Sequence, residues 1–145
     1  MKILTIFALM ISISTYAETT VKKESLKNGD SKVTISQKDH GSTTQSTSTV
    51  SKKDADSSAP FYKAIADCKP LKSVQSEAPM TVEYEVLGLI VGKCKVTTKL
   101  YVNGKPASLT TCLLTAENRK NMDTNGLELL AKVMADEKIC QTTGL

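Results

Sequence analysis

Apolar and polar residues alternate in the second half of the chain, and this alternation predicts β-strands. In residues 81–86, Val82, Tyr84 and Val86 fall on one face and two glutamates fall on the other. The same period of two resumes over residues 93–102, where lysines occupy the face opposite the apolar side chains. A period of two is typical of a half-buried strand. The two segments therefore predict neighbouring strands on which the glutamates face the lysines.

Asn103 and Gly104 mark a tight turn after the second predicted strand. Both residues tolerate a positive φ, which the favoured two-residue hairpin turns require. Residues 107–114 then return as a third strand. We therefore expect a three-stranded antiparallel meander.

Helical signals flank this meander on both sides. Residues 58–60 (Ser-Ala-Pro) combine a hydroxyl cap with a proline in the first turn, and predict a short helix that ends before Pro70. After the third strand, Thr115 lies at an N-cap position and apolar residues recur at helical spacing as far as about Lys138. Gly126 leaves two alternatives, because it either separates two helices or lets a single helix approach the sheet closely.

Residues 18–58 have a different composition, dominated by Ser, Thr, Lys, Asp and Gln, with a low-complexity stretch over 41–51. Such a segment buries too little apolar surface to offset the cost of ordering its backbone, about 1–2 kcal/mol per residue. We expect a disordered leader here. In one alternative, the alternating residues Lys32–Ser36 form an edge strand that adds to the sheet of a partner protein.

The first residues of the chain indicate export. Lys2 precedes an apolar stretch over 3–13, and Thr15-Tyr16-Ala17 has the small–x–small pattern of a signal-peptidase site. The apolar stretch is shorter than the roughly 20 residues that cross a bilayer. We therefore expect cleavage after Ala17 rather than an uncleaved anchor, and no stable membrane insertion. The predicted organisation is a signal peptide, a disordered leader and a folded domain, over residues 1–17, 18–58 and 59–145.

The cysteines indicate a disulfide framework, because an even number in a small exported chain is typical of one. The four are Cys68, Cys94, Cys112 and Cys140. The meander favours Cys94–Cys112 at the open end of one hairpin, which leaves Cys68–Cys140 to be joined by the returning helix. The first pairing needs a bulge or a longer loop near Lys105-Pro106, since a strict two-residue turn puts the two cysteines on opposite faces.

These elements together predict an α+β fold. It is a small disulfide-stabilised domain with a short N-terminal helix, a three-stranded antiparallel meander and a C-terminal helix packed on it, preceded by the disordered leader. The cysteine spacing lacks the close CxxC pairs of structural zinc sites, so we expect neither a metal nor a cofactor.

The charge balance does not favour nucleic-acid binding. The chain has 19 basic and 15 acidic residues, and without Lys2 its net charge falls from +4 to +3. Positive and negative residues are interspersed, and arginine, the better reader of phosphates and base edges, occurs only once. We expect a protein partner and no nucleic acid.

Few residues offer catalytic chemistry. The single histidine, His40, falls in the predicted leader, where nothing holds it against a nucleophile. Glu83 and Glu85 share a strand face, as paired acid/base carboxylates can, but an exposed face beside lysines is the simpler interpretation. No phosphate-binding glycine loop is present in the sequence. The sequence therefore favours a protein that is not an enzyme.

One segment is unusual for a hairpin loop, where polar residues are the rule. Residues 87–93 place Leu89, Ile90 and Val91 between two glycines. In one interpretation the first strand continues through Val91 with a bulge at Gly88 and is buried on both faces. In the other, these aliphatic residues form an exposed ridge that docks onto a partner protein or a membrane surface.

The function that these features favour is a small exported protein-binding module, periplasmic or extracellular. The alternative is a secreted effector or surface factor that uses its Ser/Thr-rich leader as a spacer or a modification platform. A lysine-rich chain with a signal peptide and no Asn-x-Ser/Thr sequon is typical of a bacterial protein. The sequence does not decide the oligomeric state.

Overall fold

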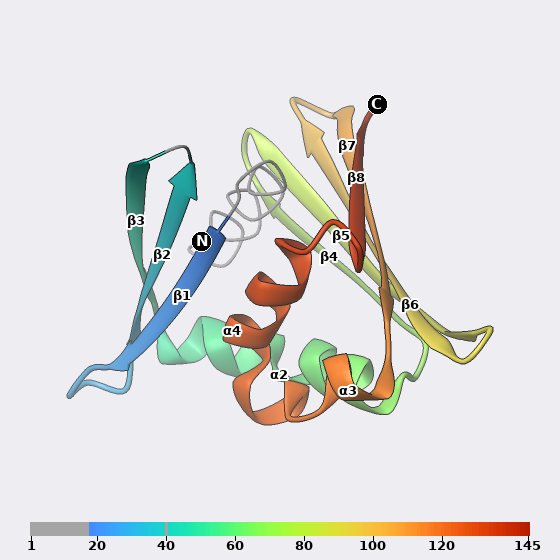
Figure 1. Cartoon of the computed structure of the whole chain (residues 1–145), viewed down its shortest axis with the longest axis horizontal. Helices are drawn as coiled ribbons and strands as arrows, with labels where there is room; N and C mark the ends of the chain where they lie inside the picture. Colours follow the sequence, from blue (N-terminus) through green and yellow to red (C-terminus); the bar gives the residue numbers. More distant parts are fainter. Residues whose placement is uncertain (1–17, 40) are drawn as a thin grey trace.

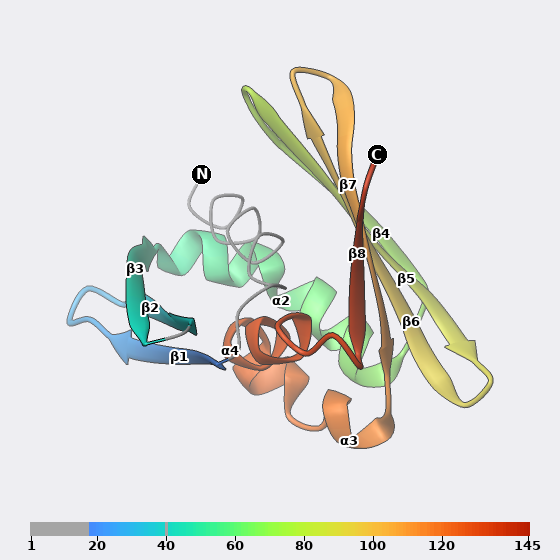
Figure 2. The same cartoon turned by 45° about the horizontal axis from the view of Figure 1, so that its top comes forward.

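A computed structural model describes residues 18–39 and 41–145 of the chain. The predicted signal peptide and His40 lie outside the described residues. Within the described part, two antiparallel sheets and three helices form an α+β fold, which confirms the predicted class. The helices lie between the two sheets (Figures 1 and 2).

The smaller sheet has the strand order β1-β2-β3 and the larger has the order β4-β5-β6-β7-β8. The strands are β1 (Glu18–Ser25), β2 (Ser31–Asp39), β3 (Ser42–Val50), β4 (Leu71–Glu77), β5 (Met80–Ile90), β6 (Lys93–Val102), β7 (Lys105–Leu114) and β8 (Cys140–Gly144). The helices are α2 (Lys52–Asp67), α3 (Ala116–Arg119) and α4 (Met122–Met134).

The predicted meander is present as β5, β6 and β7, but it is only the centre of a larger sheet. β4 and β8 add one strand at each edge and extend it to five. Neither edge strand has a strong apolar alternation of its own. Each forms because the backbone of a central strand offers it a row of hydrogen-bonding groups.

The predicted meeting of glutamates and lysines occurs at one position. Glu83 on β5 lies directly opposite Lys99 on β6. Glu85 lies opposite Thr97 on β6, and its neighbour on the other side is Lys72 of β4. The face is a mixed polar surface of the kind expected for a solvated sheet.

The expectation of a disordered leader is wrong, because residues 18–25, 31–39 and 42–50 form the three-stranded sheet. Val21, Val33, Ile35 and Val50 are buried on one face of it. Alternate positions that carry even a few aliphatic residues give a sheet one apolar face, and threonine itself favours strands. The segment Lys32–Ser36 lies in the central strand β2, paired on both sides, so it does not form an edge.

Helix α2 begins before the predicted position. Ser51 is its N-cap, and the Ser51 hydroxyl accepts a hydrogen bond from the backbone N–H of Asp54 at 3.1 Å. Pro60 therefore lies inside the helix rather than in its first turn. The earlier Ser-x-x-Asp signal is the stronger one, because it satisfies a free N–H of the first turn. The helix ends at Cys68, before Pro70, as predicted.

The predicted C-terminal helix is divided. Thr115 caps it with a reciprocal hydrogen-bonding pattern to Asn118, which confirms the N-cap. The chain then breaks at Asn121, with φ of 62°, so that α3 and α4 are separate, and residues beyond Met134 turn into β8. A second interruption lies at Asn125, directly before Gly126, where φ of −125° and ψ of 33° are not helical, as expected if Gly126 separates two helices.

Gly126 allows a close approach between helices rather than between a helix and a sheet. A Cβ at this position would lie 2.2 Å from Cγ of Tyr62 on α2. No real contact is that short, so any larger residue must displace the Tyr62 ring. Gly126 therefore sets the distance between α2 and α4.

Both disulfides are present, but their pairing differs from the expected one. Cys68 pairs with Cys94, and Cys112 pairs with Cys140. The expected pairing was wrong because strand β8 was not predicted. β8 places Cys140 directly opposite Cys112. A register shift near Leu100 does bring Cys94 and Cys112 to the same face, but Cys94 lies opposite Leu114.

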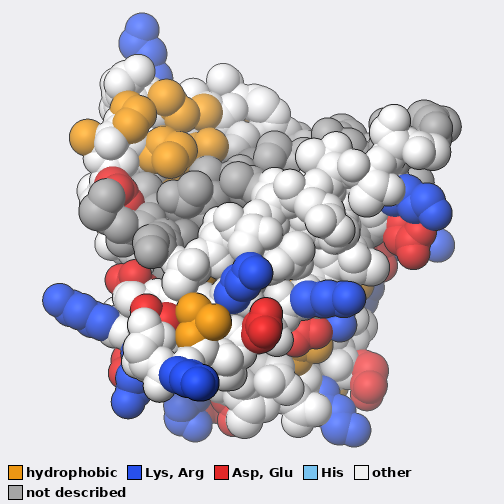
Figure 3. Space-filling view, turned by 90° about the vertical axis from the view of Figure 1, so that its left-hand side faces the viewer, with side chains coloured by type: hydrophobic (Ala, Val, Ile, Leu, Met, Phe, Trp, Pro, Cys, Tyr) orange, Lys and Arg blue, Asp and Glu red, His pale blue; other side chains and the backbone are white. Residues whose placement is uncertain are grey.

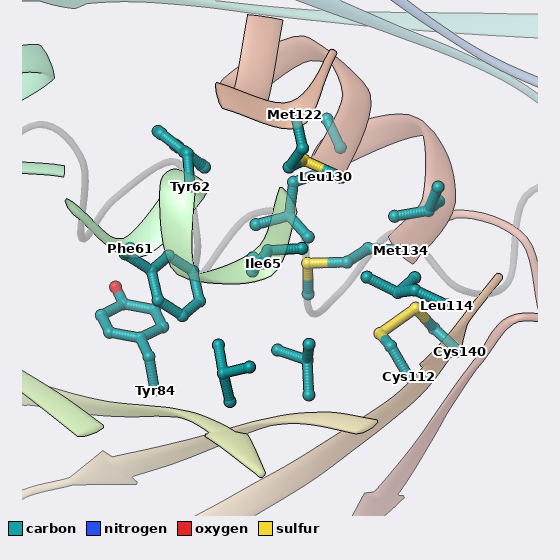
Figure 4. Close-up of a cluster of buried hydrophobic side chains, with 14 of the residues drawn as sticks. Phe61, Tyr62, Ile65, Tyr84, Cys112, Leu114, Met122, Leu130, Met134 and Cys140 are labelled. Atoms are coloured by element: carbon teal, nitrogen blue, oxygen red, sulfur yellow. A yellow bond between two sulfur atoms is a disulfide. The ribbon is translucent and has the colours of Figure 1, made fainter. Parts of the chain in front are cut away.

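The core lies between the helices and the larger sheet (Figure 4). The ring centroids of Phe61 and Tyr84 are 5.1 Å apart. Burial raises the pKa of the Tyr62 and Tyr84 hydroxyls above the ordinary value for tyrosine. The labelled side chains that meet there are Phe61, Tyr62 and Ile65 of α2, Met122, Leu130 and Met134 of α4, Tyr84, Leu114 and the Cys112–Cys140 disulfide.

Candidate functional site

The segment with the unusual aliphatic run forms the tip of the β5–β6 hairpin. Ile90 and Lys93 are the last paired residues, and Val91 and Gly92 make a two-residue loop. Their φ angles are 50° and 75°. Two positive φ angles are what a type I′ hairpin turn requires. The tip projects away from the helices at one end of the larger sheet (Figures 1 and 2).

A bulge precedes the tip, as one of the two interpretations of the sequence expected. The register shifts between Val86 and Gly88, which leaves Leu87 without a direct partner on β6. Gly88 has φ of 100° and lies against the ring of Pro70. A bulge increases the local twist of a strand, so the hairpin bends where it leaves the core.

The aliphatic side chains at the tip are exposed, so the interpretation in which both faces are buried is wrong. The exposed fractions are 42% for Leu87, 64% for Leu89, 43% for Ile90 and 97% for Val91. We call these four residues the ridge. Single exposed aliphatic residues are ordinary on protein surfaces, but a contiguous group of them indicates an interaction site.

The ridge is apolar on both faces of the hairpin. Leu89 lies opposite Cys94, whose side chain is in the core, so Leu89 belongs to the core side of the sheet. Ile90 lies opposite Lys93, on the outer side. Val91 forms the apex. A partner must therefore surround the tip to cover all of these side chains.

Val91 occupies a backbone conformation that suits it poorly. A β-branched residue with positive φ is uncommon, and such a residue costs on the order of 1–3 kcal/mol. The β6–β7 hairpin of the same sheet shows the ordinary solution. Its two-residue loop is Asn103-Gly104, with φ angles of 51° and 73°. The fold therefore has the same turn twice, once with the preferred residue and once with valine.

Basic residues border the ridge. Lys93 follows the loop, and Lys95 lies opposite Gly88 at the bulge. Leu113 lies on the other side of Lys95 and is 41% exposed, so it extends the apolar surface across the outer face. Sequence analysis missed Leu113. The signal was available, because Leu113 and Leu114 are adjacent in a strand and only one of them can face the core.

The other candidates from the sequence do not form a second site. All four cysteines are in disulfides. Among residues 18–39 and 41–145, no group of three or more metal-binding side chains comes together. Within that same part of the chain, no helix combines the length and apolarity that a bilayer crossing requires. Figure 3 shows lysines and carboxylates interspersed on the side that it displays, without a field of one sign.

One cleft lies between the smaller sheet and helices α2 and α4, with Lys23, Asp56, Tyr62 and Gly126 among its lining residues. Its volume is about 150 Å³. Pockets that hold small-molecule ligands usually measure about 300–1,000 Å³. The cleft is therefore too small to be the candidate site, and the ridge is the stronger one.

No protein-family model, curated protein or solved structure matches this chain.

Proposed function

We propose that this protein is a small exported binding module, without enzymatic activity, that docks onto a partner protein through the ridge. The observation that carries the proposal is the strained and almost fully exposed valine at the apex, Val91. Asparagine at this position would remove both the strain and the exposed apolar surface. A residue that is unfavourable for folding in two ways is best explained by a requirement other than folding.

The shape and charge of the tip define the partner surface. A convex tip with aliphatic side chains on both faces fits a concave apolar pocket. Lys93 and Lys95 stand at its border, so acidic residues around the pocket would complement them. Apolar anchors surrounded by charged residues are the usual arrangement of a protein–protein hot spot.

Export is supported by the disulfides and by the predicted signal peptide. Two disulfides suggest an oxidising environment, because thiols in the cytosol are normally kept reduced. The partner would then be periplasmic or extracellular. The alternative role of residues 18–58 as a flexible spacer has little support, because β1, β2, β3 and the start of α2 lie within them.

The test uses a photo-reactive amino acid placed at Leu89 in the native host. A matched probe at Lys105, beside the Asn103-Gly104 loop, controls for contact with any exposed hairpin. We expect one protein to be cross-linked from the Leu89 position and not from the control. Mass spectrometry identifies that protein, which is then purified for titration.

The decisive comparison is wild type against Val91→Asn in that titration. We expect the variant to bind at least about tenfold more weakly, because the apical anchor is lost. We also expect it to be more stable by about 1 kcal/mol in urea unfolding, because the strain is relieved. Equal affinity would contradict the proposal. Binding to anionic phosphatidylglycerol vesicles that is lost in Val91→Asn, without a protein cross-link, would assign the ridge to a membrane surface instead.

A further inference from the structure

Strand β3 is an open edge of the smaller sheet. It pairs with β2 over its whole length, from Ser42 opposite Asp39 to Val50 opposite Ser31, without a register shift. Within the described residues, no strand pairs with its other side. Figure 1 shows β3 on the left of the molecule, on the side of β2 opposite to β1. Its outer backbone N–H and C=O groups are therefore available.

Edge strands are normally protected against pairing with other chains by charge, proline, bulges or short length. The other three edges of this protein follow that rule. β1 carries two lysines and two glutamates, β4 carries Lys72 and Glu77, and β8 has only five residues. β3 has nine residues with no charge, no proline and no bulge, and is the longest edge among the described strands.

The chemistry of this edge selects an extended strand as its ligand. Regularly spaced backbone donors and acceptors bind another backbone, as in strand addition. Nine residues at about 3.3 Å each offer an edge of roughly 30 Å. Five of the nine residues, Ser42 to Gln45 and Thr47, are exposed. Their hydroxyl and amide groups can pair across strands, as Thr34 and Thr47 already do at 3.5 Å.

We propose that β3 pairs antiparallel with β3 of a second copy of this chain, which joins two small sheets into one of six strands. In a two-fold antiparallel pair, residues near the middle of the strand lie close to their own copies, so a charged residue there is repelled by its copy. β3 avoids this repulsion because residues 42–50 are uncharged. β1 could not pair with itself in this way, because Lys22 and Lys23 would approach their copies. The edge has no charges or side-chain pockets, so it offers few features by which a different protein could recognise it specifically.

This dimer is independent of the ridge. β3 and the β5–β6 tip lie at opposite sides of the molecule (Figures 1 and 2). A two-fold pair through β3 therefore leaves both tips free. Such a dimer would carry two ridges, and two linked sites bind a repeated or clustered partner more tightly than one.

The test uses the natural protein, purified with both disulfides intact. Sedimentation velocity from micromolar to millimolar concentration measures dimer formation, and amide hydrogen exchange is followed in parallel. We expect a dimer whose formation slows exchange in residues 42–50 but not in β1. The variant Gln45→Lys places an ammonium group on the edge and should raise the dimer dissociation constant at least about tenfold. The control is Thr20→Lys, because Thr20 and Gln45 are both opposite Ser36 on the two edges of one sheet.

A measurement without any substitution completes the test. A peptide of residues 42–50 should dissociate the wild-type dimer, and a peptide of the same composition in scrambled order should do so less well. A monomer at every concentration would overturn the proposal. So would a dimer that Gln45→Lys leaves intact, or one that Thr20→Lys weakens equally. Protection of β3 by an unrelated strand without self-association would assign the edge to another protein.

Discussion

The two sheets of this protein are stabilised in different ways. The five-stranded sheet carries three of the four cysteines, and its central strands β5 and β6 alternate clearly between apolar and polar residues. The three-stranded sheet has no cysteine and consists largely of serine, threonine and lysine, with one row of aliphatic residues on its inner face. One sheet is cross-linked, and the other depends on packing against helix α4.

The difference shows why composition alone misjudged the first half of the chain. A Ser/Thr-rich segment is expected to be disordered if its residues are considered one by one. A strand, however, needs apolar residues only at alternate positions on one face, and only where the neighbouring strands have them too. Val21 and Ile35 are direct cross-strand partners, so two isolated aliphatic residues become one buried pair.

We expect the largest effect from removing a disulfide of the five-stranded sheet. Replacing Cys112 and Cys140 by alanine removes a disulfide between residues 28 apart in sequence. The chain-entropy model gives a loss of about 3–4 kcal/mol in the free energy of unfolding. Urea unfolding measures this loss, and amide exchange should show that β7 and β8 open first. An unchanged urea midpoint would mean that the bond adds no stability.

We expect a smaller effect on stability from a substitution that separates α2 from α4, the helix on which the three-stranded sheet packs. Gly126→Ala forces the Tyr62 ring out of contact with α4, which should cost about 1–3 kcal/mol. Exchange should accelerate in β1, which packs on α4, more than in β5 and β6. Gly144→Ala is the matched control, because no atom lies within 4 Å of a Cβ there. Equal effects of the two substitutions would contradict the close contact at Gly126.

The smallest effect tests the junction between the three-stranded sheet and α2. Ser51→Ala removes the N-cap at the end of β3 and should cost about 1 kcal/mol. Ser57→Ala, at an exposed position inside the same helix, should change the stability by less than about 0.5 kcal/mol. Thermal unfolding measures both. If the segment before Pro60 were disordered, the two variants would be equally stable. That result would contradict an ordered three-stranded sheet joined to α2.

Sequence analysis located the central elements because each depends on its own residues. The alternation of Val82, Tyr84 and Val86 predicted β5, Asn103-Gly104 predicted the turn between β6 and β7, and Thr115 predicted the cap of α3. The ridge was one of two interpretations, because a run such as Leu89–Val91 suits a buried strand as well as an exposed one. Whether these side chains are exposed depends on how far the helices cover the sheet. The periodicity of the sequence does not carry that information.

The edge strands β4 and β8 and the disulfide pairing could not be predicted from local sequence patterns. β8 has the sequence Cys-Gln-Thr-Thr-Gly and little tendency to form a strand alone. It forms because β7 presents an open edge, and its position then determines which cysteine lies beside Cys112. One unpredicted strand was therefore enough to change both pairings.

The sequence by itself determined the α+β class, the central meander, the Asn103-Gly104 turn, the Thr115 cap and the involvement of all four cysteines in disulfides. Each of these follows from local geometry, from residue spacing or from the redox chemistry of thiols. The tertiary structure alone decided the second sheet, the cysteine partners, the exposure of the ridge and the open edge at β3. These depend on which backbone and which faces meet across the chain, and contacts between residues far apart in sequence are not recorded in any local pattern.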